Sequence, residues 1–429
     1  MQIDFSKIKA VHLIGIGGIG TSAIARMFLL EGKSVSGSDL GENEVTDELK
    51  KLGARVSLNQ HAENVPSAAD LVIYTIAVSA ENPELVEAKC RGIRTLSYPE
   101  VLGIISKEKF TIAITGTHGK TTTTAMVAKI LMDAGFDPTV ILGSFLLPSA
   151  DITQTGRRLT PTTRTNFVAG KSKYLVVEGC EYRRSFLNLH PTILVITNID
   201  VDHLDYYKDL NDIKNAFAEL AAKVPSDGVL LNDFAAFPLP EGFKLKIPGR
   251  HNIQNAKAAL AVAKVLKIPE AKALKSLAEF SGTWRRFEYR GKSKNGALVY
   301  DDYGHHPHEI EATLQGAQEL YPSQKIVVVF QPHLYSRTKD HLAGFGRCFK
   351  QADEIIVLSI YAAREIDPGG INAEMVVAEI KKNGQSAHFV STFADAAKKS
   401  VELARGEGII ITMGAGETNK VADILIKNI

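Results

Sequence analysis

The clearest chemical signal in this chain is a short glycine-rich loop that carries a lysine and a threonine. Glycines let a backbone turn its N–H groups toward one centre, the start of a helix adds partial positive charge there, and a lysine supplies a mobile cation. The loop is two residues shorter than the common G-x-x-x-x-G-K-[ST] pattern, and a purely structural turn is the alternative. The lysine and threonine favour a site for ATP phosphates, formed by Gly116, Thr117, His118, Gly119, Lys120, Thr121 and Thr122.

An acidic residue and a histidine follow two apolar runs that come after this loop. Glu178 ends the run 174–177, and His203 lies shortly after the run 192–197. In an open α/β sheet, ligands bind at the carboxyl ends of the strands. Thr121 places a hydroxyl where a Mg²⁺ ion bridging two phosphates would lie. The sequence therefore predicts a Mg²⁺ site of Thr121, Glu178 and His203, although a histidine in such a place often only caps or packs.

A second glycine-rich loop lies near the N-terminus, after the apolar run 10–14. Asp39 follows the last glycine of this loop by 19 positions. Such a loop at the start of a helix holds a diphosphate. NAD and a nucleotide-sugar diphosphate both satisfy it, so the loop alone leaves both ligands open. Its G-x-G-x-x-G pattern consists of Gly15, Gly17, Gly18 and Gly20.

Further polar side chains gather at one helix start and in the last third of the chain. Asn252 and Asn255 lie three apart at the start of an alanine-rich helix, where they cap the helix or bind a nucleotide base. The segments 301–307 and 331–337 each follow an apolar run, and they predict another functional edge. The adjacent histidines of the first segment lack the ligand spacing of a zinc site.

Short apolar runs alternate with helical patterns along the whole chain. This alternation predicts an α/β protein of three domains: an N-terminal Rossmann-like domain, a central P-loop ATP-binding domain and a C-terminal Rossmann-like α/β domain. We place these domains at 1–105, 106–290 and 291–429. The polar region 149–173, which contains Arg157, Arg158 and Arg164, is expected to be a solvated connector or a mobile loop near substrate. The predicted strands lie at 10–14, 34–38, 71–75, 95–96, 110–114, 174–177, 192–197, 297–300, 326–330, 354–358 and 408–412.

Composition narrows the class of protein. With 45% apolar and 23% charged residues among 429, the chain has the composition of a soluble globular protein, and its net charge of +2 gives no indication of a nucleic-acid partner. Three widely separated cysteines fit a reducing compartment. The charged N-terminus and the lack of a long apolar run argue against a signal peptide and a membrane span. We therefore expect a cytoplasmic protein with no membrane partner.

Together these stretches resemble the ATP-dependent Mur ligases of bacterial cell-wall synthesis over nearly the whole chain. In that family the first domain binds the UDP part of the substrate, the second binds Mg-ATP and the third receives the amino acid. The pattern is most similar to that of the members that add L-alanine. The motifs, in family order, are GIGGIGTSAIA (15–25), GTHGKTTT (116–123), VVEGCEYRRSFL (176–187), TNIDVDHLD (197–205), GRHNIQNAKAALA (249–261), WRRFE (284–288), DDYGHHPHEI (301–310) and QPHLYSRT (331–338).

The resemblance implies roles for individual residues. The first glycine loop and Asp39 would hold the UDP diphosphate, so the NAD interpretation becomes less favourable. The nucleotide pocket would include Asn252, Asn255, Arg286 and Asp302. The amino-acid side would be lined by Tyr303, His305, His333 and Arg337. Catalysis would fall to Lys120, Arg286 and, as a candidate base for the amine, His305.

The resemblance also implies the reaction and the partners. ATP and Mg²⁺ would be the cofactors, and L-alanine would be joined to the lactyl carboxylate of UDP-N-acetylmuramate through an acyl phosphate, in peptidoglycan precursor synthesis. No nucleic acid is expected to take part, and the protein is expected to be a monomer or a homodimer.

Two segments depart from the pattern of the alanine-adding members. Their E-A-D-E-S-D is replaced by a sequence with Cys180 and Arg183 at the two aspartate positions, and the arginine of their Q-P-H-R-Y is Leu334. The second departure leaves the amine open. Three alternatives therefore stay in view: a ligase of the same family that recycles murein tripeptide, whose metal segment reads E-Y-D; an NAD-dependent oxidoreductase; and a non-catalytic, nucleotide-gated binding protein.

Overall fold

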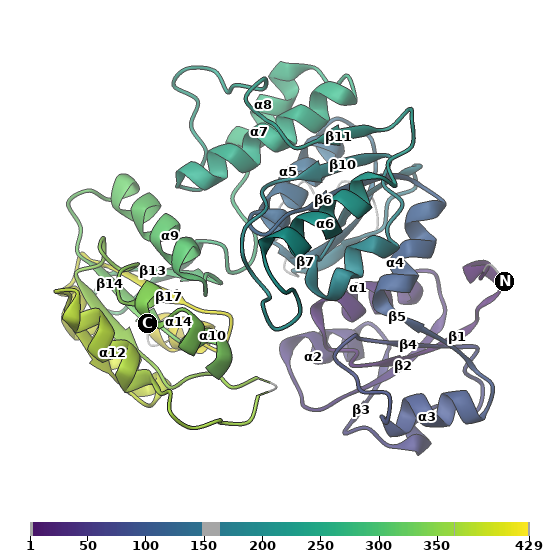
Figure 1. Ribbon diagram of the computed structural model, residues 1–429, viewed down its shortest axis with the longest axis horizontal. Helices are drawn as coiled ribbons and strands as arrows, with labels where there is room; N and C mark the ends of the chain where they lie inside the picture. The colour runs from purple at the N-terminus through teal and green to yellow at the C-terminus, as the bar shows by residue number, and fades with distance from the viewer. Residues whose placement is uncertain (1–2, 148–163, 364, 428–429) are drawn as a thin grey trace. The chain divides into compact units, whose positions relative to one another are not determined.

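The structure, a computed structural model, describes residues 3–147, 164–363 and 365–427. It confirms the predicted three-domain α/β architecture, with three mainly parallel sheets that follow one another along the chain (Figure 1). The exact domain boundaries stay predictions. Within the described residues, no helix is both long enough and apolar enough to cross a membrane.

The chain divides into two compact units. The first comprises Met1–Phe243 and Gln254–Phe280 and holds the first two sheets. The second comprises Lys244–Ile253 and Ser281–Ile429 and holds the third sheet. Helix α7 (Arg250–Val265) begins in the second unit and continues into the first.

The N-terminal sheet is entirely parallel, in the order β3-β2-β1-β4-β5. Its central strands are almost completely buried apolar runs because helices cover both faces of a parallel sheet. Its elements are β1 (Ala10–Ile14), α1 (Ile19–Leu30), β2 (Ser34–Asp39), α2 (Glu44–Lys51), β3 (Arg55–Leu58), β4 (Leu71–Tyr74), α3 (Pro83–Cys90), β5 (Arg94–Ser97) and α4 (Tyr98–Lys107).

The middle sheet has the order β11-β10-β6-β9-β7-β8, and only its edge strand β8 runs antiparallel to its neighbour. The central β6 feeds the lysine-containing loop, which opens α5. The elements are β6 (Phe110–Thr115), α5 (Lys120–Asp133), β7 (Thr139–Leu146), β8 (Thr165–Val168), β9 (Tyr174–Glu178), the 3₁₀ segment η4 (Tyr182–Asn188), β10 (Ile193–Ile196), α6 (Leu210–Ala221), β11 (Val229–Leu231), α7 and α8 (Glu270–Glu279).

The first two sheets share one hydrophobic core within the first unit. Asn166 on β8 donates from its amide nitrogen to the carbonyl of Ile19 (2.5 Å) and to the hydroxyl of Ser22 (2.8 Å), both on α1. A Cβ atom added to Gly103 of α4 would lie only 2.7 Å from the carbonyl oxygen of Asn188. This close packing holds the two glycine-rich loops in one body.

The third sheet has the order β12-β13-β17-β14-β15-β16, and only β12 is antiparallel to its neighbour. Its buried β14 and β17 consist almost wholly of β-branched residues, as expected for central strands covered on both faces. The elements are β12 (Glu288–Lys292), β13 (Leu298–Asp302), α9 (Pro307–Leu320), β14 (Ile326–Phe330), α10 (Tyr335–Asp340), α11 (Leu342–Phe345), β15 (Glu354–Val357), α12 (Ala373–Lys382), β16 (Ala387–Phe389), α13 (Phe393–Ala404), β17 (Ile409–Met413) and α14 (Asn419–Lys427).

One expectation from the sequence is wrong. The region 149–173 is not wholly a connector, because β8 within it is a buried strand whose Asn166 donates its amide hydrogens to α1. The part with Arg157 and Arg158 lies outside the described residues. Asn252 lies inside the first turn of α7 and donates its amide hydrogen to the carbonyl of Pro248 (2.6 Å).

A buried polar network links the first two strands to α3. The imidazole of His12 lies 2.9 Å from the Ser36 hydroxyl and 3.1 Å from the Glu84 carboxylate. Ser38 (2.6 Å) and Asn64 (2.7 Å) also donate to Glu84, which is fully buried. Burial raises the pKa of Glu84, but these donors more than offset it, so the pKa lies below its ordinary value.

We predict that Glu84→Gln lowers the free energy of unfolding at pH 7 by about 2 kcal/mol, because charge-assisted hydrogen bonds inside the core are lost. A carboxyl whose pKa is depressed by folding stabilises above its unfolded pKa, and that contribution is lost as pH falls through the folded pKa. The difference from the wild type should therefore shrink in acid. Urea denaturation between pH 3 and pH 7 measures both effects. The exposed neighbour Glu81 supplies the control Glu81→Gln, and equal stability of both variants would contradict the prediction.

Candidate active site

The loop between β6 and α5 requires its glycines. Gly116 (φ +138°) and Gly119 (φ +81°) occupy backbone conformations that other residues rarely adopt. A Cβ atom on Gly119 would lie 2.3 Å from the side-chain oxygen of Asn255, and one on Gly116 would lie 2.0 Å from the hydroxyl of Thr197. The structure therefore brings Asn255 against the phosphate loop, as the expected nucleotide role requires.

The end of β10 holds the same loop from the other side. The side chain of Asn198 accepts from the backbone N–H of His118 (2.9 Å) and donates to its carbonyl (2.9 Å). The hydroxyl of Thr117 accepts from the N–H of Asp200 (2.9 Å). Thr122, like most of α5, is buried. These bonds fix the loop before any ligand arrives.

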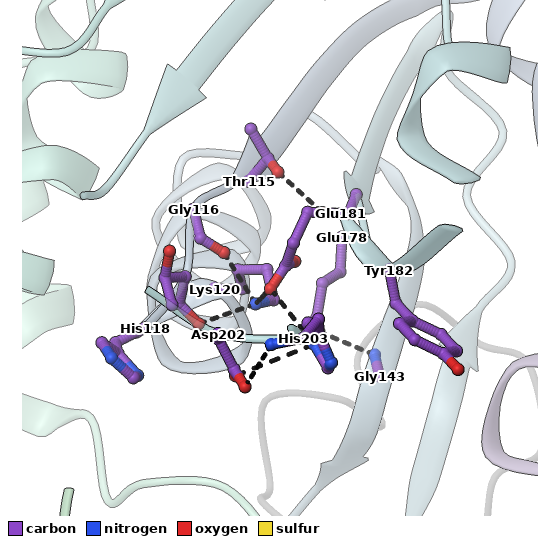
Figure 2. Close-up of polar contacts among 12 residues, drawn as sticks. Thr115, Gly116, His118, Lys120, Gly143, Glu178, Glu181, Tyr182, Asp202 and His203 are labelled. Carbon is purple, nitrogen blue, oxygen red and sulfur yellow. Dashed lines mark hydrogen bonds and ion pairs between the residues drawn. The ribbon is translucent and has the colours of Figure 1, made fainter. Parts of the chain in front are cut away.

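The ammonium group of Lys120 lies over the loop at the centre of the site (Figure 2). It donates to the carbonyls of Gly116 (2.7 Å) and Thr117 (2.9 Å) and pairs with the Glu181 carboxylate at 2.9–3.0 Å. Burial disfavours the charged lysine, but the neighbouring carboxylates, Glu181 above all, raise the pKa of Lys120 above its ordinary value. Lys120 is thus a fixed cation at neutral pH.

Two groups of possible metal ligands surround this lysine. The hydroxyl of Thr121 donates to one oxygen of Glu178 (2.9 Å), whose other oxygen accepts from the N–H of Gly143 (2.8 Å). Ligand atoms of Glu181, Asp202 and His203 all lie within 4.8 Å of one another. Carboxylate and hydroxyl oxygens suit a hard cation such as Mg²⁺. These residues could therefore hold the ion, with His203 grouped with Glu181 and Glu178 with Thr121.

Sequence reasoning left Glu181 without a role, although the structure places it at the centre. Its side chain is only 3% exposed, and it lies 2.9 Å from Lys120 and 3.6 Å from the His203 imidazole. The signal was its position three residues after Glu178, in the turn that follows β9. The end of a strand predicts a role only for the first residue beyond it. The sequence therefore gives no indication that Glu181, three residues further on, lies beside the lysine.

The N-terminal glycine loop is closely packed as well. A Cβ atom on Gly15 would lie 2.6 Å from Thr75, and one on Gly20 would lie 2.7 Å from the ring of Tyr98. Gly17 donates its N–H to the Asp39 carboxylate (2.7 Å). Asp39 therefore orders the loop itself, in addition to any contact with ligand.

A cavity of about 320 Å³ lies in the first unit, against the N-terminal glycine loop and the residues that follow β9. One part of its wall is Gly18 and its neighbours in the N-terminal loop, and another is Glu178 beside the phosphate loop. Most of the remaining wall is apolar. Its other lining residues include Tyr98, Pro99, Leu102, Cys180, Phe186 and Leu189.

The second unit gathers the residues expected on the amino-acid side. The rings of Tyr303 and His305 lie 5.5 Å apart, and those of His305 and His333 lie 6.0 Å apart. Arg337 approaches His333 Nδ1 to 3.1 Å, and His333 stacks on Tyr361 (5.7 Å). These four predicted residues thus form one cluster, with Tyr361 as a member that the sequence did not suggest.

Asp302 and Arg286 also lie in the second unit. Asp302 accepts from the N–H groups of Phe287 and Gly304, each at 2.7 Å, and burial raises its pKa above the ordinary value. The guanidinium of Arg286 lies 5.3 Å from the centre of the Tyr303 ring. Both residues shape the segment that carries Tyr303, and their expected roles toward the nucleotide stay predictions, as does that of Asn252.

Leu334 occupies an unusual backbone conformation (φ +68°, ψ +138°) immediately before α10. Its side chain is buried (6% exposed), and its N–H donates to the carbonyl of Tyr361 (2.9 Å). An arginine in this environment would need a buried partner for its charge. Leucine therefore fits its surroundings in this chain.

Three family models match the chain. The model described as Mur ligase family, catalytic domain, matches residues 10–110, and the Mur ligase middle domain matches residues 114–239. The model described as Mur ligase, glutamate ligase domain, matches residues 285–416.

Curated relatives match the chain over almost its full length. A UDP-N-acetylmuramate–L-alanine ligase of Caldanaerobacter subterraneus subsp. tengcongensis is 39% identical, and the match covers 99% of this chain and 98% of the relative. An enzyme of the same name from Clostridium botulinum is 38% identical over 99% of this chain and 100% of the relative.

Solved structures show the same fold. The crystal structure of UDP-N-acetylmuramate–alanine ligase from Thermotoga maritima superposes with a TM-score of 0.81 at 29% identity, covering 97% of this chain and 98% of that one. A murein peptide ligase from Psychrobacter arcticus gives a TM-score of 0.68 at 22% identity, covering 98% of each chain, which is a likeness of fold alone.

We predict that Lys120→Ala lowers the rate of ATP turnover at least about a hundredfold, because a preorganised cation is removed from the developing phosphate charge. Binding of the UDP substrate should change little, since we expect the N-terminal loop to hold it. Steady-state kinetics and calorimetric titration measure the two effects. Lys129→Ala, on the same helix, is the matched control, and a Lys120→Ala enzyme with most of its activity would contradict the role.

We also predict that Glu178→Gln and Glu181→Gln each raise the Mg²⁺ concentration needed for half-maximal ATP turnover by at least about tenfold, because each removes a carboxylate from the ligand set. Magnesium titrations of activity at fixed ATP test this. Glu63→Gln, in the N-terminal domain, should leave the titration unchanged. A variant whose magnesium dependence equals that of the wild type would remove its glutamate from the metal site.

Proposed function

Because the chain belongs to the Mur ligase family, we propose that it joins L-alanine to the lactyl carboxylate of UDP-N-acetylmuramate. It is an ATP-dependent ligase that forms an amide bond. The γ-phosphoryl group of ATP passes to the carboxylate, and ADP leaves. The amine then attacks the resulting acyl phosphate, which gives the amide, a proton and inorganic phosphate.

The observation that carries the proposal is the cavity of the first unit. Its wall includes both the loop suited to a diphosphate and Glu178, beside the loop suited to ATP. A UDP-sugar held by the first loop would extend its carboxylate toward the second. Two polyanions brought together in this way react with little covalent help from the protein, since positioning and charge neutralisation supply most of the catalysis.

Lys120 holds the ATP phosphates and neutralises the charge that develops on the transferred group. Thr121, Glu178, Glu181, Asp202 and His203 are the residues that would hold Mg²⁺. When bound, Mg²⁺ draws charge from the phosphate oxygens and makes the γ-phosphorus more open to attack. Asn255, packed against the phosphate loop, is a contact for the nucleotide. The apolar cavity wall limits water, which would otherwise hydrolyse the acyl phosphate.

The cluster of the second unit receives the amino acid. Arg337 and His333 would bind the carboxylate of L-alanine. His305 Nδ1 lies 3.0 Å from the carbonyl of Tyr303. A carbonyl only accepts, so Nδ1 carries the hydrogen and Nε2 the lone pair that can take a proton from the amine. We further expect the enzyme to work in the cytoplasm, as a monomer or a homodimer.

The recycling of murein tripeptide is the second candidate. Glu181 and Tyr182 match the E-Y pair of that ligase, and its fold is shared. The buried Leu334, in place of an arginine, is the other reason why the identity of the amine substrate has to be determined by experiment. Family membership removes the oxidoreductase alternative, and it disfavours a non-catalytic binding protein.

We predict that phosphate release from ATP with UDP-N-acetylmuramate is fastest with L-alanine in a panel that also contains L-serine, glycine and the tripeptide. Discrimination against glycine should be modest, about tenfold, because one methyl group contributes little binding energy. Mass spectrometry of the product identifies the amide. A preference for the tripeptide would replace the alanine assignment, and no release with any amine would refute the ligase proposal.

A further inference from the structure

We propose that Tyr182 is a positioning residue that holds the imidazole of His203 toward its carboxylate neighbours. The inference rests on the Mg²⁺ site of the proposed function and adds a residue to it. Tyr182 offers no strong ligand of its own to a cation. At this position the alanine-adding pattern has serine, which is too short to reach across to a ring.

His203 needs outside support to keep its geometry. Its backbone lies in the left-handed region (φ +55°), which residues other than glycine seldom occupy. Such a conformation persists only when the surroundings hold it. Its Nε2 atom lies 3.6 Å from Glu181 and 3.7 Å from Asp202. Rotation of the ring would move this nitrogen away from both carboxylates.

The backbone of His203 is held by its own hydrogen bonds, among them its N–H to the Asp202 carboxylate (2.7 Å), and Tyr182 adds a contact to the ring. Its ring lies 4.8 Å from the His203 ring, tilted by 44° (Figure 2). Its hydroxyl donates to the carboxylate of Asp205 (2.9 Å), two residues beyond His203. The tyrosine thus contacts the segment at two points, the imidazole of His203 and the side chain of Asp205. This leaves few ring orientations for His203.

The tyrosine is itself firmly placed. The guanidinium of Arg183 lies 5.5 Å from the centre of its ring and donates to the carbonyl of Ile76 (3.2 Å). The next residue, Arg184, pairs with Asp212 (2.7 Å). These contacts anchor the two residues that follow Tyr182 in the turn. The ring therefore acts as a rigid support and not as a mobile surface group.

The test measures metal binding without requiring turnover. Binding of Mn²⁺ to the full-length protein with saturating ADP is followed by electron paramagnetic resonance of free Mn²⁺. We expect Tyr182→Leu to weaken Mn²⁺ binding about tenfold, as loss of a group that orients a ligand does. Tyr182→Phe, which keeps the ring, should stay within about threefold of the wild type. Tyr206→Leu removes a nearby ring that lies 6.4 Å from Tyr182 and serves as the matched control.

A second readout reports on His203 directly. Nuclear magnetic resonance spectra are recorded on metal-free protein whose 12 histidines carry an isotope label. The signals of His203 are assigned by their loss in His203→Gln. In Tyr182→Leu these signals should shift and broaden while those of the other histidines stay in place. A loss of fold would move them all.

Three results would overturn the inference: Mn²⁺ binding by Tyr182→Leu equal to the wild type, an equal loss in Tyr206→Leu, or His203 signals that do not move. The proposed function fails by a different result, the absence of phosphate release with every amine. The expected order of Mn²⁺ affinities would support the inference even then.

Discussion

The buried contact between Lys120 and Glu181 is the interaction on which the site depends. It joins the phosphate loop to the turn after β9, and both side chains are largely removed from water. Removing one member of such a pair leaves a buried charge without compensation, which typically costs about 3–5 kcal/mol. The carboxylates of Glu178 and Glu181 both act on the Lys120 ammonium group, and Asp202 lies beside Glu181. This local excess of negative charge favours the binding of a divalent cation. An anionic ligand such as the phosphates of ATP would be repelled by the carboxylates unless that cation were bound.

Much of this site could be predicted from the sequence. Glycines followed by lysine and threonine limit the conformations that the loop backbone can adopt. The sequence alone therefore predicts a phosphate loop at Gly116–Thr121. Glu178 and His203 followed from the rule that parallel strands end at one edge. The four residues of the amino-acid cluster came from the family resemblance, and the structure groups them. These predictions rest on local geometry or on residues that follow strands.

The missed features depend on contacts between distant segments. Glu181 is held near the lysine by contacts from other segments: the Tyr207 hydroxyl donates to its carbonyl, and the N–H of Gly179 donates to Ile114 of β6. Strand β8 was assigned to a connector because its polar Asn166 finds partners only on α1. Among the described residues, the strands that periodicity did not reveal all lie at sheet edges except β7, and the edge strands are short or partly exposed, which weakens the apolar pattern. They are β3, β7, β8, β11, β12 and β16.

The bond between Asp39 and Gly17 gives the N-terminal loop a selectivity of its own. A loop that offers backbone N–H groups attracts anions, yet here a carboxylate lies within it and accepts from one of those groups. The field at this end of the loop is therefore of mixed sign. A ligand with hydroxyl groups beside its diphosphate can donate to the free lone pairs of Asp39, whereas a ligand with a further phosphate at that point meets electrostatic repulsion. The loop thus discriminates among nucleotides by where their charge lies, in addition to how much charge they carry.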